Sequence, residues 1–89
     1  MIILFDKKFD KRFIKQAKKV QEKFFVRLKI FGVNQFNSVL NNHKLTGKYE
    51  GCWSINVTGN HRAIYKILIE KDREIYVFIA IGTHPELYE

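Results

Sequence analysis

Hydrophobic residues in the first part of the chain recur every three or four positions, which is the spacing of one face of an α-helix. The members of this stripe are Phe9, Phe13, Ala17, Val20 and Phe24. Asp6 stands just before it and is suited to begin a helix, because its carboxylate accepts hydrogen bonds from free backbone N–H groups of the first turn. The pattern therefore predicts a helix that starts after Asp6.

A second helical stretch runs from about Gln21 to Phe31. Its apolar stripe consists of Phe24, Phe25, Leu28 and Phe31. Gly32 is expected to end it, since glycine favours the position just after a helix. No strong breaker separates the two stretches, so they form either one bent helix or a hairpin of two helices with the turn near Val20. We favour the hairpin.

The second half of the chain has the patterns of β-strands. Residues 53–58 alternate between apolar and polar side chains, which is the period of a half-buried strand. Gly59-Asn60 is a dipeptide typical of a hairpin turn. The segment from Arg62 to Ile69 is almost wholly apolar, as expected of a central strand, and Ile75 to Ile81 is apolar on both faces.

Helices followed by strands predict an α+β fold, with an N-terminal helical hairpin packed on one face of a small antiparallel sheet of three to four strands. Met1 to Phe5 is a candidate edge strand, and residues 34–47 look irregular. Residues 1–89 are enough for one domain and too few for two. No apolar run approaches the roughly 20 residues of a membrane span, and the opening segment lacks the features of a signal peptide. We therefore expect a cytoplasmic protein without a membrane partner.

The charge balance indicates a polyanionic partner. Sixteen Lys and Arg residues against nine Asp and Glu give a formal net charge of +7. Such an excess fits nucleic acid, an acidic protein or a membrane surface, and charge alone does not choose among them. The single cysteine, Cys52, excludes an internal disulfide and a cysteine-based metal site.

Three histidines, His43, His61 and His84, lie near the ends of the expected strands. None is paired with another at helical ligand spacing, and no acidic residue stands at ligand spacing from them, so we expect no metal and no cofactor. Arg62 begins the middle strand and His84 follows the next strand. An antiparallel hairpin would bring these two residues to the same edge of the sheet.

This placement suits the cleavage of RNA without metal. A base must take the proton of the 2′-hydroxyl, an acid must protonate the leaving 5′-oxygen, and a cation must stabilise the crowded phosphate. Histidine titrates near neutral pH and serves in either proton transfer, and arginine binds phosphate oxygens in a bidentate manner. The alternative is that the histidines are ordinary loop residues.

Four local motifs, in order and at the right spacing, resemble the RelE/ParE toxin superfamily, and most nearly its YafQ-like mRNA interferases. These motifs are His43-Lys44-Leu45-Thr46-Gly47, Gly51-Cys52-Trp53-Ser54-Ile55, Gly59-Asn60-His61-Arg62-Ala63-Ile64-Tyr65 and Gly82-Thr83-His84-Pro85-Glu86-Leu87-Tyr88. The family typically shows a His-x-Leu-x-Gly loop, a Gly-x-x-Arg-x-x-Tyr strand and a closing Gly-x-His-x-x-x-Tyr or Phe. The likeness covers nearly the whole chain.

The resemblance implies a type II toxin, a ribonuclease that cuts mRNA in the ribosomal A site and is silenced by an acidic antitoxin. It assigns the general acid to His84 and a proton-transfer role to His43. It places Arg62 at the scissile phosphate and Tyr88 against the substrate, where an aromatic ring stacks on a base. The lysines of the first helices would then contact ribosomal RNA.

The sequence departs from the YafQ-like pattern at two places. A histidine on the first sheet strand is replaced here by Asn56, and an Asp-Trp pair at the hairpin is replaced by Asn60-His61. His61 either takes over the role of the missing imidazole or is an exposed turn residue. We count it among the catalytic candidates, and Asn56 and Lys44 among the substrate-binding ones.

Two other functions fit the same sequence. A ParE-like toxin poisons DNA gyrase without cutting nucleic acid, but such relatives generally lack the histidines, so His43 and His84 favour the nuclease. An inactive relative that only binds its antitoxin is the other possibility.

Overall fold

Two long strands form the centre of the sheet in the computed structural model, which describes residues 1–89. They are β4 (His61–Glu70) and β5 (Arg73–Thr83), joined by a tight turn in which Lys71 and Asp72 have positive φ. The five strands lie in the order β1-β5-β4-β3-β2. The outer strands are β1 (Ile2–Phe5), β2 (His43–Lys44) and β3 (Trp53–Asn56).

The α+β class is confirmed, but the expectation of a purely antiparallel sheet was wrong. β1 pairs with β5 in parallel, with Ile2 opposite Ile75, while the other neighbours are antiparallel. Along the chain, two helices separate β1 from the other strands. No tight turn therefore forces β1 to run antiparallel to its neighbour β5. The two-residue β2 lies in the segment expected to be irregular, and it brings the number of strands to five instead of the expected three to four.

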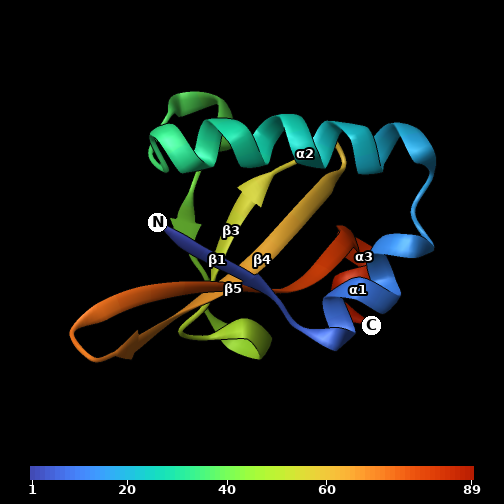
Figure 1. Ribbon diagram of the computed structural model, residues 1–89. Helices are drawn as coiled ribbons and strands as arrows, with labels where there is room; N and C mark the ends of the chain where they lie inside the picture. Colours follow the sequence, from blue (N-terminus) through green and yellow to red (C-terminus); the bar gives the residue numbers. More distant parts are fainter.

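The two N-terminal helices do not form a hairpin on one face. α1 (Lys7–Ile14) ends earlier than expected, and α2 (Lys18–Val33) includes Val20, where we expected the turn, and Gly32, where we expected the end. α2 lies across one face of the sheet, whereas α1 packs against β5 near the short C-terminal helix α3 (His84–Tyr88) (Figure 1). None of the helices combines the length and hydrophobicity needed to cross a lipid bilayer.

The main core fills the space between α2 and the sheet. Its largest completely buried side chains include Tyr65, Phe24, Phe31 and Phe78. A smaller cluster of Ile64, Ala80 and Leu87 lies on the opposite face, beneath α3. The β4–β5 register shifts between Ile64 and Tyr65, which leaves Ile79 without a partner and places both Ile79 and Ala80 against this smaller cluster. This second face, covered in part by α3, is the one on which the cavity described below opens.

Phe24 offers a test of the main core. Its ring is fully buried and meets the rings of Phe9 and Phe78 at centroid distances of 5.2 and 5.5 Å. Phe24→Ala should lower the free energy of unfolding by about 3–5 kcal/mol, because removal of the ring leaves a cavity that the core fills only in part. The neighbouring Phe25→Ala, at a side chain that is 52% exposed, is the matched control and should cost far less in urea titrations. Equal losses of stability would contradict this arrangement of the core.

Candidate active site

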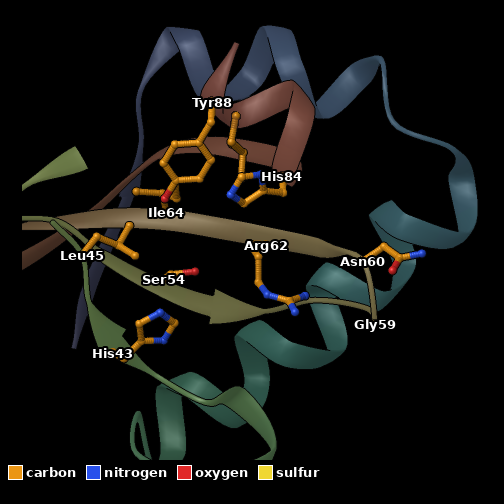
Figure 2. Close-up of a pocket in the computed structure, with 10 residues that line it drawn as sticks. His43, Leu45, Ser54, Gly59, Asn60, Arg62, Ile64, His84 and Tyr88 are labelled. Atoms are coloured by element: carbon orange, nitrogen blue, oxygen red, sulfur yellow. The ribbon is translucent and has the colours of Figure 1, made fainter. Parts of the chain in front are cut away.

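A cavity of about 330 Å³ opens on the sheet face opposite α2. Strands β2, β3 and β4, the β3–β4 turn and helix α3 all contribute to it (Figure 2). Its lining consists of His43, Leu45, Ser54, Gly59, Asn60, Arg62, Ile64, His84, Leu87 and Tyr88. His43 lies on one side, His84 and Tyr88 lie on the other, and Arg62 is between them (Figure 2). The structure therefore brings together two histidines and the arginine that the sequence singled out.

The β4–β5 pairing carries His84 to the cavity. Arg62 lies opposite Gly82, and His61 lies opposite Thr83, so the residue after Thr83 emerges at the same edge as Arg62. There Thr83 caps α3 through a capping box with Glu86. The backbone N–H of Thr83 donates to Glu86 Oε1 at 2.8 Å. This local turn, rather than a continued strand, directs His84 and Tyr88 over the sheet.

The Glu86 carboxylate is held in its ionised form. The backbone hydrogen bond from Thr83 is the main reason that its pKa is lowered, and desolvation opposes the effect. Gly82 leaves room for this carboxylate, since a Cβ at that position would lie 2.9 Å from Glu86 Oε1. The capping box thus depends on a glycine on the preceding strand.

The Glu86 pKa predicts an acid-sensitive contribution to stability. Because the folded-state pKa is lowered, the contribution is present above the unfolded pKa of roughly 4.3 and is lost as the pH falls through the folded value. Glu86→Gln should therefore lower the thermal midpoint at neutral pH and narrow its gap to the parent in acid. The measurement is a series of thermal melts of both proteins, from neutral pH down to acid below the lowered pKa of Glu86. A gap that stays constant with pH would contradict the assignment.

His43 presents one ring nitrogen to the cavity side of β2. Its Nδ1 lies 2.8 Å from the carbonyl oxygen of Asn41, and since a carbonyl only accepts, Nδ1 carries the proton. Asn41 adopts a left-handed conformation, with φ of 45°. In the neutral ring Nε2 is then unprotonated, as a general base requires.

Arg62 is anchored at one of its nitrogens. Nη1 donates to the carbonyl oxygens of Thr58 and His61, each at 2.9 Å. The other nitrogens of the guanidinium make no hydrogen bond within the protein and remain available to an anion. The β3–β4 turn thus fixes the direction of the charge without neutralising it.

Tyr88 lies one helical turn after His84, and the two rings stack with centroids 4.5 Å apart. Tyr88 also meets the ring of Tyr49 edge-on at 5.3 Å. The Tyr49 hydroxyl and Lys48 Nζ both donate to the carbonyl oxygen of Leu87, at 2.8 and 2.9 Å. The end of α3 is therefore held by the segment that follows the His43 motif.

Three of the proposed site residues do not line the cavity. His61 is turned toward Thr58, whose Oγ1 lies 2.8 Å from its Nδ1. Lys44 is exposed on β2. Asn56 faces its cross-strand partner Arg62, and its buried Oδ1 has no hydrogen-bond partner.

Sequence reasoning missed several residues that shape the cavity. Ser54 is buried on the same face as Arg62, and the alternation along residues 53–58 already placed it on the polar side of its strand. Leu87 lies on α3, and Tyr49 donates a hydrogen bond to its carbonyl oxygen. The sequence analysis did not predict α3 as a helix, so it did not connect these two residues with the cavity. The Thr-x-x-Glu spacing of Thr83 and Glu86 is the signal that would have revealed it.

The structure holds no group of three or more His, Cys, Asp or Glu side chains arranged as metal ligands would be. Burial raises the pKa of the Cys52 thiol, with Lys66 opposing the shift. The thiolate form that a nucleophile needs is thereby disfavoured. The side chains that line the cavity bring imidazole, guanidinium and hydroxyl groups to it, from His43 and His84, from Arg62, and from Ser54 and Tyr88.

Comparison with protein-family models and with curated proteins finds no match, whereas solved structures match along almost the whole chain. YafQ from E. coli is 24% identical, with a TM-score of 0.76 over 98% of this chain and 97% of that one. A YoeB/ParE toxin from Agrobacterium tumefaciens is 17% identical, with a TM-score of 0.72 over 94% and 99%. The E. coli DinJ-YafQ toxin-antitoxin complex matches at 25% identity, with a TM-score of 0.66 over 98% and 96%. The chain therefore has the fold of the RelE/ParE toxin superfamily, as the resemblance in its sequence predicted.

Proposed function

We propose that this protein is the toxin of a type II toxin–antitoxin system and a metal-independent endoribonuclease that cleaves mRNA on the ribosome, in the cytoplasm. The observation that carries the proposal is the single cavity lined by His43, Arg62 and His84. The fold shared with YafQ and YoeB/ParE toxins supports it.

The reaction begins at the 2′-hydroxyl next to the scissile phosphate. His43 Nε2 takes the hydroxyl proton, and the 2′-oxygen attacks phosphorus. The bond from phosphorus to the 5′-oxygen breaks as His84, in its protonated form, gives that oxygen a proton. The products are a 2′,3′-cyclic phosphate and a free 5′-hydroxyl, and no oxidant or metal enters the balance.

Arg62 and Tyr88 would hold the substrate during this reaction. The free guanidinium nitrogens of Arg62 donate to the phosphate oxygens, where negative charge accumulates in the transition state. Tyr88, already stacked on His84, offers its ring to a base next to the scissile bond. Lys44, exposed beside His43, is a further contact for the strand.

The proposed partners are inferred from the net charge of the protein and from the solved structures that share its fold. A net charge of +7 fits an acidic antitoxin that wraps the toxin as a segment folding on binding. Matching structures include the DinJ-YafQ and YoeB-YefM complexes. The exposed lysines of α1 and α2 would contact ribosomal RNA.

A translating extract tests the proposal. Purified protein should produce cuts at defined positions in mRNA, mapped by primer extension, and ribosome-free mRNA should be cut far less. Stalled gyrase complexes on DNA without RNA cuts would instead establish a ParE-like poison. If neither appears while an acidic antitoxin still binds, the protein is an inactive relative.

A further inference from the structure

A second concave surface lies on the same sheet face as the candidate active site. It encloses about 340 Å³ and is lined by Lys8 and Arg12 of α1, Lys48 and Tyr49 of the 3₁₀ turn Gly47–Tyr49, Lys66 of β4, and Asp6. Ile79 and Ala80, which the β-bulge turns to this face, also line it. We call this surface the basic groove.

Positive charge in the basic groove is concentrated and largely uncompensated. Four cationic side chains from three separate elements face one carboxylate, that of Asp6, which already accepts the N–H of Lys8 as the cap of α1. Lys8 and Arg12 lie one helical turn apart and therefore point the same way. A concave surface lined by one sign of charge focuses the potential and attracts anions.

The hydrogen bonds of these cations do not neutralise them. Arg12 Nη1 donates to the carbonyl oxygen of Glu86 at 3.2 Å, and Lys48 Nζ donates to that of Leu87 at 2.9 Å. Both acceptors are uncharged backbone groups at the end of α3. The side chains of Lys8 and Lys66 make no hydrogen bond within the protein, so they are free to bind a ligand.

The basic groove adjoins the candidate active site. Leu87 lines the active-site cavity, while its carbonyl oxygen is held by Lys48 and Tyr49 of the groove. Tyr49 in the groove meets Tyr88 in the cavity edge-on at 5.3 Å. A pair of aromatic rings at the boundary between two cationic sites fits a polymer that alternates bases and phosphates.

We propose that the basic groove binds a backbone phosphate of the same RNA strand that enters the active-site cavity, one or more nucleotides away from the scissile bond. The inference rests on the proposed function, because it takes RNA as the ligand of the neighbouring cavity. It adds a second phosphate site with Lys8 and Lys66 as its free ligands, and it assigns Lys8 to this strand while the other exposed lysines of α1 and α2 contact ribosomal RNA. Tyr49 and Tyr88 separate the two sites.

Binding of uncleavable RNA tests this proposal. The probes are fluorescent single strands with 2′-O-methyl groups throughout, a dinucleotide and a chain of about eight nucleotides, titrated against the full protein at several salt concentrations. The parent should bind the longer chain more tightly than the dinucleotide. Lys8→Gln/Lys66→Gln should lose about tenfold in affinity for the longer chain and little for the dinucleotide. Its salt slope should become shallower by about 0.7 for each phosphate that the variant no longer neutralises.

The matched control is Lys19→Gln/Lys23→Gln, which removes the same charge from exposed positions of α2 that line neither cavity. It should weaken binding by no more than about twofold. Lys66→Gln alone, with the thermal midpoint measured beside it, keeps the test valid if the double variant folds poorly.

Several outcomes would overturn the proposal. They are equal losses of affinity in the two double variants, equal losses for the two RNA lengths, and the absence of any gain with length in the parent. Polyglutamate serves as a probe for an acidic protein. If Lys8→Gln/Lys66→Gln lost binding to polyglutamate but kept its binding to RNA, the groove would be assigned to an acidic protein instead. Length-dependent binding through Lys8 and Lys66 without mRNA cleavage in the extract would sustain the groove and refute the nuclease. Cleavage of mRNA by the parent, together with unchanged RNA binding by Lys8→Gln/Lys66→Gln, would support the nuclease and refute the groove.

Discussion

His84→Ala is expected to reduce mRNA cleavage by roughly 100- to 10,000-fold, the range for loss of a positioned proton-transfer group. His84 is exposed at the first turn of α3 and makes no hydrogen bond that supports the fold, so its loss should leave the thermal midpoint nearly unchanged. The measurement is the single-turnover rate of cleavage on programmed ribosomes. The same rate in the variant and the parent would remove His84 from the mechanism.

His84→Gln separates proton transfer from stacking and hydrogen bonding. Glutamine keeps a polar planar group beside Tyr88 but cannot transfer a proton near neutral pH. It should therefore be as inactive as alanine if His84 is the general acid. Substantial recovery with glutamine would mean that His84 only positions Tyr88 or the substrate. A basic limb of the pH–rate profile that disappears in the variant would support the acid role.

Arg62→Ala is expected to lower the cleavage rate by roughly 100- to 1,000-fold, as does removal of other preorganised groups that stabilise transition-state charge. The turn carbonyls of Thr58 and His61 hold Nη1 at 2.9 Å, so the charge is in place before substrate arrives. Arg62→Lys should recover only part of the rate, because an ammonium lacks the planar fork. The loss should appear in the rate at saturating ribosomes more than in affinity.

Melting and binding measurements complete that test. If Arg62→Ala stays within a few-fold of the parent rate, the phosphate role is wrong. If it loses both stability and activity, loss of the turn bonds explains the result unless Arg62→Lys restores stability while recovering only part of the rate.

Local patterns predicted the two long helices and the strands β1, β3, β4 and β5, though not all of their ends, and they missed β2 and α3. Asp6 caps α1 as predicted, since its carboxylate accepts from Lys8 N at 2.7 Å. The break between the helices lies at residues 15–17, before the expected turn near Val20, and Val20 itself is buried within α2. Gly32 stays inside α2, since one unfavourable residue does not end a helix that is held by tertiary packing.

Pairing between distant segments was harder to predict from the sequence. The parallel contact of β1 with β5 joins the two ends of the chain, and neither segment carries a local signal for its partner or direction. The short β2 exists only because β3 lies beside it, with His43 opposite Ser54. That pairing places His43 on the rim of the cavity.

The sequence by itself determined which chemical groups the protein has: a basic single domain, an α+β order of elements, and three histidines and an arginine at element ends. The tertiary structure decided which of these residues meet. The register of β4 and β5, the capping of α3 and the pairing of β2 place His43, Arg62 and His84 around one cavity and leave His61 outside it. The physical reason is that side-chain type and spacing are local properties. The convergence of side chains depends instead on hydrogen bonds and packing between residues far apart in the chain.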